Sequence, residues 1–144
     1  MNDSTVLIVG AGPGLSASLG RVFKSKGMKI GLAARNTNKL SSIKAELEAE
    51  VFECDSTNKI SVKKLFTETD LKIGTPNLVI YNPSIRIQKP FIEIDSDEMH
   101  QSILVNSFGA FLVAQESAKR MLQRGSGSIF FTGSSASVKG FAKS

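Results

Sequence analysis

Short apolar runs alternate with longer stretches of helical periodicity from one end of the chain to the other. Four consecutive apolar residues, Val6 to Val9, predict a fully buried strand, and three of them are β-branched. Similar short runs predict further strands at residues 29–34, 50–54, 77–81 and 128–132.

The stretches between these strands carry apolar residues at the spacing of a helix. Leu15, Leu19 and Val22 recur in this way over residues 14–26, and Gly27 is suited to follow the end of that helix. Further helices are expected from about residue 36, at 58–70 and at 95–124.

The longest of these helices opens with Asp95-Ser-Asp-Glu98, which has the form of a capping box. Strands that alternate with helices in this order predict βαβ units, a parallel sheet and right-handed crossovers. We therefore expect one domain, residues 1–144, with a doubly wound α/β parallel sheet of the Rossmann type and about five strands.

Three glycines, Gly10, Gly12 and Gly14, separate the first strand from the first helix. A strand that breaks on glycines into a helix gathers free backbone N–H groups and the positive end of the helix at one point. Glycine suits such a turn because its φ is unrestricted and because a Cβ would hold a phosphate away. The turn predicts a pyrophosphate site, and the alternative is a glycine-rich turn that binds nothing.

Charge and composition bear on whether the chain binds nucleic acids or membranes. The formal net charge is +5, but the basic residues are scattered, so we expect solvated helix ends and no nucleic-acid partner. No apolar stretch approaches the ~20 residues of a membrane span, and no basic, apolar leader opens the chain. The single cysteine, Cys54, excludes an internal disulfide. These features predict a cytoplasmic protein with no membrane partner.

The end of the second strand bears on the choice of cofactor. Nicotinamide-binding folds hold the ribose 2′-hydroxyl with a carboxylate about 20 residues past the glycines, where this chain has Ala34 and Arg35. A guanidinium there can pair with a 2′-phosphate, and no carboxylate repels it. We therefore expect NADP in preference to NAD, with Asn36 and Lys39 able to reinforce the pocket. The alternatives are a solvated arginine and, for Asn36, a helix N-cap.

The glycine-rich turn resembles a known family. Gly10-x-x-x-Gly14-x-Ser16 is similar to the T-G-x-x-x-G-x-G loop of short-chain dehydrogenases/reductases, with Val9 in place of Thr and Ser16 in place of the last Gly. After the fourth strand, Tyr81-Asn82-Pro83-Ser84 stands where the family has Asn-Asn-Ala-Gly, so only Asn82 matches. The resemblance extends over all 144 residues but over only the cofactor-binding half of the family's domain.

The resemblance implies which residues hold the cofactor. Asp55 takes the adenine amino group, Asn82 serves the adenosine end, and the pyrophosphate is held by Gly10, Gly12, Gly14 and Leu15. From its place at the end of the third strand, Asp55 is alternatively a turn or N-cap residue. Tyr81, the only tyrosine, is expected in the core and not as an acid. We assign no metal ligand.

Two polar residues fall where the family places part of its catalytic set. Asn106 lies among apolar residues of the long helix, and Val105-Asn106-Ser-Phe-Gly109 resembles the helix whose Asn holds a water of the proton relay. The alternative for Asn106 is a structural amide with a local partner. Ser134 follows the fifth strand, where the family's serine hydrogen-bonds the substrate carbonyl. Ser135 is one step away, so both stay open, as does a serine-rich loop without a function.

The family's proton donor does not occur in this sequence. In the family a Tyr supplies the proton and a Lys four positions later lowers its pKa, but no Tyr-x-x-x-Lys is found anywhere in the chain. We therefore expect the N-terminal part of a longer reductase, with the later strands missing. The fifth strand would then be an apolar sheet edge, and Phe108, Phe111 and Leu112 would lie uncovered.

Together these features predict an NADP-preferring oxidoreductase that transfers hydride between nicotinamide and a small-molecule carbonyl or alcohol substrate. We expect a homo-oligomer for the full-length protein and no turnover by this chain alone, because the proton donor is absent from it. The alternative is a non-catalytic dinucleotide-binding or regulatory module that dimerises through the long helix.

Overall fold

β1 (Thr5–Val9) runs through the middle of a parallel sheet, and each of its residues is at most 1% exposed. The computed structural model describes residues 4–140. β2 and β4 pair with the two edges of β1, which gives the five-stranded order β3-β2-β1-β4-β5. The other strands are β2 (Lys29–Ala34), β3 (Glu50–Glu53), β4 (Leu78–Tyr81) and β5 (Ser128–Phe131). The predicted doubly wound parallel sheet is confirmed.

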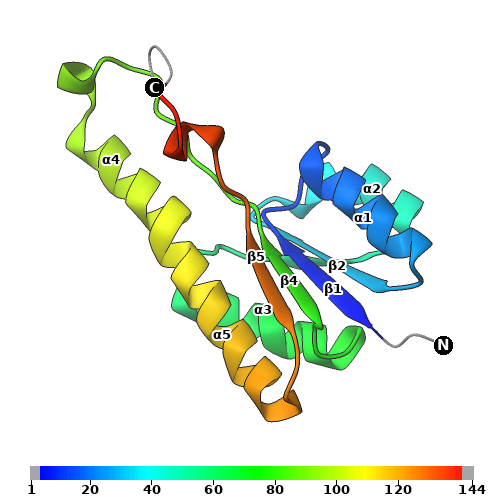
Figure 1. Ribbon diagram of the computed structural model, residues 1–144. Helices are drawn as coiled ribbons and strands as arrows, with labels where there is room; N and C mark the ends of the chain where they lie inside the picture. The colour runs from blue at the N-terminus through cyan, green and yellow to red at the C-terminus, as the bar shows by residue number, and fades with distance from the viewer. Residues whose placement is uncertain (1–3, 141–144) are drawn as a thin grey trace.

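Helices cover both faces of the sheet (Figure 1). Successive residues of a strand point to opposite faces, so Val6 and Ile8 enter one core while Leu7 and Val9 enter the other. The first core lies under α1 and α2, and the second under α3 and α5. Their bounds are α1 (Leu15–Ser25), α2 (Ser41–Leu47), α3 (Lys59–Lys72) and α5 (Gly109–Arg124).

The helix predicted from about residue 36 begins differently. A 3₁₀ turn, Thr37–Leu40, precedes α2, and the Asn36 side chain caps that turn by accepting a hydrogen bond from the Asn38 N–H at 3.1 Å. The other short helices, α1 and α3, begin and end within two residues of their predicted bounds.

The long helix predicted at residues 95–124 is interrupted, and the spacing of its apolar residues did not predict this. α4 (Ser96–Ile103) opens with the predicted capping box at Asp95 and Glu98. A π-turn, Leu104–Phe108, then joins α4 to α5, with the Gly109 N–H bonded to the Leu104 carbonyl five residues back. The Tyr81 hydroxyl donates to the Val105 carbonyl inside this wide turn, at 2.5 Å. The helix therefore widens where it meets a buried polar group of β4.

Gly109 lets the helix approach the sheet at this point. A Cβ on Gly109 would lie 2.4 Å from the Tyr81 hydroxyl oxygen and 3.0 Å from the Ser56 carbonyl oxygen. Neither atom can move away, because Tyr81 is buried and hydrogen-bonded and the Ser56 carbonyl is backbone. The π-turn and the glycine that follows it thus form one close contact with the end of β4.

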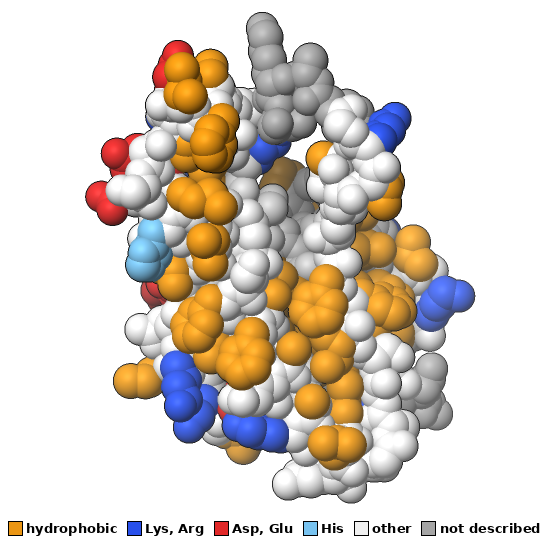
Figure 2. Space-filling view, turned by 60° about the vertical axis from the view of Figure 1, so that its left-hand side comes forward, with side chains coloured by type: hydrophobic (Ala, Val, Ile, Leu, Met, Phe, Trp, Pro, Cys, Tyr) orange, Lys and Arg blue, Asp and Glu red, His pale blue; other side chains and the backbone are white. Residues whose placement is uncertain are grey.

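Apolar side chains gather on the side of the molecule that carries α4, α5 and the edge strand β5 (Figure 2). Phe130 and Phe131 of β5 and Phe111 of α5 are each more than half exposed, and Phe108 is 42% exposed. The predicted apolar edge is confirmed. The predicted exposure of Leu112 is wrong, since this side chain belongs to the core under α5.

A membrane span is not found among residues 4–140, where every helix is too short or too polar to cross a bilayer.

Replacing Gly109 with Ala tests the close contact between the π-turn and β4. Although Ala usually favours a helix over Gly by about 1 kcal/mol, we expect Gly109→Ala to lower the free energy of unfolding by about 1–3 kcal/mol, because the new Cβ displaces Tyr81 and Ser56. Urea denaturation followed by circular dichroism measures the change.

Gly20→Ala in α1 is the matched control. Its Cβ would also meet a neighbour at 2.4 Å, but that neighbour is the terminal Cδ1 methyl of Leu47, which can rotate away. We expect its free energy of unfolding to change by less than about 1 kcal/mol. Equal losses in the two variants would contradict a special role for the contact at Gly109.

Candidate functional site

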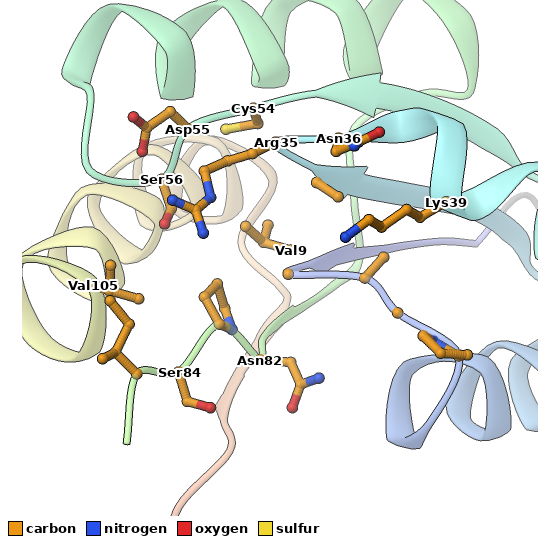
Figure 3. Close-up of a pocket in the computed structure, with 17 residues that line it drawn as sticks. Val9, Arg35, Asn36, Lys39, Cys54, Asp55, Ser56, Asn82, Ser84 and Val105 are labelled. Carbon is orange, nitrogen blue, oxygen red and sulfur yellow. The ribbon is translucent and has the colours of Figure 1, made fainter. Parts of the chain in front are cut away.

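A cleft of about 430 Å³ opens at the carboxyl ends of β1 and β4. The chain leaves β1 toward β2 on one side, whereas β4 lies on the other side, so the connections diverge at this point. Five segments line the cleft: the glycine-rich turn, the end of β2 through Lys39, the end of β3 through Ser56, the loop from Asn82 to Ile85, and Val105 of the π-turn (Figure 3).

The glycine-rich turn bends sharply beneath Pro83. Gly10 has φ +78°, and a Cβ there would lie 2.4 Å from the Pro83 nitrogen. The N–H groups of Gly10 and Ala11 both donate to the Ala33 carbonyl at 2.9 Å, which holds the turn against β2. Only glycine combines this φ with this close approach.

The two other glycines face open space. A Cβ on Gly12 or Gly14 would meet no protein atom within 4 Å. Gly14 is also the N-cap residue of α1, and no side chain caps that helix. Gly12 lines the cleft, whereas Gly14 and Leu15 lie beside it and do not line it. At Gly12 the turn therefore presents backbone to the cleft, and the uncapped start of α1 lies beside the cleft.

A buried serine ties this turn to the end of β4. The Asn82 Nδ2 donates to the Ser16 hydroxyl oxygen at 2.9 Å, and that hydroxyl donates to the Gly10 carbonyl at 3.3 Å. Ser16 stands where the motif T-G-x-x-x-G-x-G ends in glycine, and its role here did not follow from the sequence. Asn82 lines the cleft as expected, and its amide N–H group holds the turn in place.

The wall of the cleft that is formed by the end of β2 and the turn after it is cationic. The side chains of Arg35 and Lys39 reach into the cleft from the end of β2 and from the 3₁₀ turn that follows it (Figure 3). Both are exposed, and neither forms a hydrogen bond or ion pair within the described part of the chain. Asn36 lines the same wall, but its side-chain oxygen is occupied in capping the turn. Among residues 4–140, neither of these two cations that face the cleft has a partner.

The end of β3 supplies Asp55 and Cys54 to the lining. One Asp55 carboxylate oxygen accepts hydrogen bonds from the N–H and the hydroxyl of Thr57 at 2.9 and 2.8 Å, so this residue does form a turn. Asn58, and not Asp55, caps α3. Burial raises the pKa of the Cys54 thiol to about 11, which favours the protonated thiol at neutral pH.

Asn106 lies next to the cleft and holds one of its walls. Its Nδ2 donates to the Ile85 carbonyl at 2.8 Å and to the Ser102 hydroxyl at 2.9 Å, and its Oδ1 accepts from the Ile85 N–H at 2.9 Å. Asn106 is exposed, so these bonds are not required by burial, but together they link the helix to the loop after β4. Because Ile85 lines the cleft, Asn106 fixes the position of the loop that follows β4.

Ser134 and Ser135 are exposed and do not line the cleft. Ser134 caps a 3₁₀ turn, Ser135–Ser137, by accepting a hydrogen bond from the Ala136 N–H at 3.1 Å. The segment leaves the sheet beside β4, because the Thr132 N–H donates to the Tyr81 carbonyl at 3.0 Å. The two serines therefore come after the carboxyl end of β5, beside the end of β4, and do not enter the cleft.

Tyr81 is 3% exposed, as expected for a core residue. Burial raises the pKa of its hydroxyl above the usual value, which makes it a poorer acid at neutral pH. Its hydroxyl contacts the Ser56 hydroxyl at 3.1 Å as well as the Val105 carbonyl. Ser56 and Val105 both line the cleft, and their connection through Tyr81 depends on tertiary contacts that no sequence pattern indicates.

Known proteins are similar to this chain in sequence. An uncharacterised oxidoreductase of Staphylococcus aureus is 28% identical over 144 residues, which are 98% of this chain and 61% of that protein. One from Mycobacterium tuberculosis is 33% identical over 145 residues, covering 94% of this chain and 56% of that protein. The chain therefore spans about three fifths of the length of these curated relatives.

Solved structures match the fold closely. A short-chain dehydrogenase from Rhodopseudomonas palustris superimposes with a TM-score of 0.89 at 26% identity, over 99% of this chain and 69% of that one. A gluconate 5-dehydrogenase from Burkholderia cenocepacia, in complex with NADP and tartrate, gives a TM-score of 0.82 at 26% identity, over 91% of this chain and 53% of that one.

The family profile of the short chain dehydrogenases matches residues 4–144, which is nearly the whole chain. The glycine-rich turn under Pro83, the five-stranded parallel sheet and the match over this length agree. The chain belongs to the short chain dehydrogenase family.

Proposed function

We propose that this chain binds NADP in the cleft and forms the cofactor-binding part of an oxidoreductase that acts on a small-molecule carbonyl or alcohol. The observation that carries the proposal is the pair of unpartnered cations, Arg35 and Lys39, at the end of β2. Ala34 and Arg35 occupy the place where a carboxylate would select NAD. A 2′-phosphate would give both cations an anionic partner.

The glycine-rich turn would hold the pyrophosphate. The space above Gly12 and Gly14 is empty of protein atoms, and the start of α1 offers N–H groups that no side chain caps. Ser16 and Asn82 hold the turn in this shape before any ligand arrives. The NADP complex of the gluconate 5-dehydrogenase relative supports the same choice of cofactor.

Asp55 and Asn82 would serve the adenosine end of the cofactor, because both line the same cleft as Arg35 and the glycine-rich turn. Leu15 would contribute its backbone N–H at the first position of α1. When bound, the cofactor supplies the hydride at its nicotinamide ring. Asn106 would hold the loop at Ile85 in place beside it, and Ser134 or Ser135 would hydrogen-bond the substrate carbonyl once their segment approaches.

The proton that accompanies hydride transfer must come from outside these residues. No Tyr-x-x-x-Lys occurs in the sequence, and Tyr81 is buried with a raised pKa. We therefore expect the chain to bind NADPH and to show no reductase turnover by itself.

A second candidate is a nucleotide-binding module that dimerises without turnover. The apolar band over α5 and β5 favours it, together with an adjoining groove of about 440 Å³ lined in part by Met121, Leu122 and Ile129. A dimer in sedimentation that binds NADPH and stays inactive when the C-terminal part of a relative is supplied supports this candidate. A monomer that gains activity under the same conditions excludes it.

Arg35→Ala tests the origin of the NADP preference. We expect the affinity for NADPH, measured by nicotinamide fluorescence, to fall by about tenfold to a hundredfold, because a charge-assisted hydrogen bond to the 2′-phosphate is lost. The affinity for NADH should change little, since it has no phosphate at that position.

Lys44→Ala is the control for this experiment. Lys44 is an exposed cation on α2 that does not line the cleft, so its removal changes the net charge by the same amount without touching the proposed pocket. An equal loss of NADPH affinity in both variants would refute a specific role for Arg35.

Gly12→Val separates cofactor binding from folding. A Cβ at Gly12 contacts no protein atom, so we expect the free energy of unfolding to change by less than about 1 kcal/mol. The side chain would occupy the space assigned to the pyrophosphate, so NADPH affinity should fall by about a hundredfold or more.

Gly133→Val is the matched variant, because a Cβ there is equally free of contacts and the residue lies outside the cleft. It should retain NADPH binding. If Gly12→Val binds NADPH as the unchanged chain does, the pyrophosphate lies elsewhere.

A further inference from the structure

The buried Tyr81 hydroxyl connects separate walls of the cleft. Ser56, at 3.1 Å from it, follows β3, and Val105, whose carbonyl lies at 2.5 Å, belongs to the π-turn of the long helix. Both of these residues line the cleft. Tyr81 itself is the last residue of β4 and lies behind them. One phenolic oxygen therefore joins β4, the segment after β3 and the long helix.

The direction of these hydrogen bonds follows from their chemistry. A carbonyl oxygen can only accept, so the Tyr81 proton is committed to Val105. The Ser56 hydroxyl is then the donor to the Tyr81 oxygen. The result is a directed chain, Ser56 to Tyr81 to Val105, in which each member is at least 90% buried. Such a chain permits only one arrangement of the three segments without leaving a buried polar group unpaired.

The π-turn also carries the contact to the loop that follows β4. Val105 precedes Asn106, whose side chain forms hydrogen bonds with both the N–H and the carbonyl of Ile85. Asn106 occupies its position because the helix has the wide turn at Leu104–Phe108, and the Tyr81 hydroxyl bonds the carbonyl of Val105, the residue before Asn106 in that turn. Rewinding the turn to a regular helix would rotate Asn106 away from Ile85, since residues of an α-helix are spaced at 100°.

We propose that Tyr81 is a positioning residue, whose hydroxyl holds the π-turn in register so that Asn106 clamps Ile85 and keeps the loop after β4 against the cleft. Its link to cofactor binding rests on the proposed function, whereas its effect on the loop does not. A core tyrosine with no such role would stabilise the whole domain evenly. A positioning residue controls one loop more than the rest of the chain.

Tyr81→Phe separates these two roles, because it removes the hydroxyl and keeps the ring in the core. The measurement is the exchange rate of individual backbone amides by nuclear magnetic resonance. We expect the Ile85 amide to exchange about tenfold faster, since its bond to Asn106 is no longer held in register, while the amides of β1 change by less than about threefold.

Ser117→Ala is the matched control. Ser117 is a buried hydroxyl of α5 that donates to the Val113 carbonyl at 2.7 Å, so its removal also deletes one buried hydroxyl-to-helix bond. It lies away from the π-turn, and we expect no change at Ile85. Ser56→Ala keeps the Tyr81 ring and its bond to Val105, and it should accelerate exchange at Ile85 in the same direction by about threefold.

Unchanged exchange at Ile85 in Tyr81→Phe would overturn the proposal, as would equal acceleration at Ile85 and in β1. If Tyr81→Phe does not fold, the same comparison is decided by Ser56→Ala against Ser117→Ala. NADPH titration of the folded variants adds a second readout, with about a fivefold loss of affinity expected for Tyr81→Phe and none for Ser117→Ala. A chain that binds no NADPH at all contradicts the proposed function alone, because the exchange at Ile85 needs no nucleotide.

Discussion

The close approach of Gly10 to Pro83 is the contact on which the cleft depends. The chain leaves β1 at Gly10 with a left-handed φ, directly beneath the first residues after β4. A side chain at that point would push apart the two segments whose separation forms the entrance between β1 and β4. Since β1 is buried between β2 and β4 over its whole length, the turn cannot shift along the sheet to relieve a clash.

Polar side chains link the walls of the cleft to one another. Ser16 and Asn82 join the glycine-rich turn to β4, Tyr81 joins β4 to the long helix, and Asn106 joins that helix back to the loop. Each bond has a partner on a different element, so the shape of the cleft is set by the protein alone. Preorganisation of this kind lowers the entropy that a ligand loses on binding.

Much of the fold followed from the sequence because it depends on local patterns. The apolar runs at Val6–Val9 and elsewhere are long enough to mark buried strands, and the three glycines mark the turn. The π-turn did not follow, because it depends on a hydroxyl 24 residues earlier in the chain. The burial of Leu112 was missed for a similar reason, since the side of α5 that faces the sheet is set by the tertiary structure. Arg35 and Lys39 could be singled out because they follow the glycines at a fixed spacing along the chain, and both line the cleft, whereas the hydrogen bonds of Ser16 depend on the tertiary structure.

The central position of β1 has a consequence for how the domain assembles. β1 is the first strand in the chain, yet its second neighbour, β4, is separated from it by α1 and two complete βα units, and the Thr5 N–H bonds an Asn77 side chain 72 residues away. During synthesis β1 can pair with β2, and β2 with β3, long before β4 exists. One edge of the most apolar strand therefore stays open through that interval. Non-local pairing of this kind slows folding and exposes the unpaired edge to other chains, so assembly of this domain is governed by the arrival of β4.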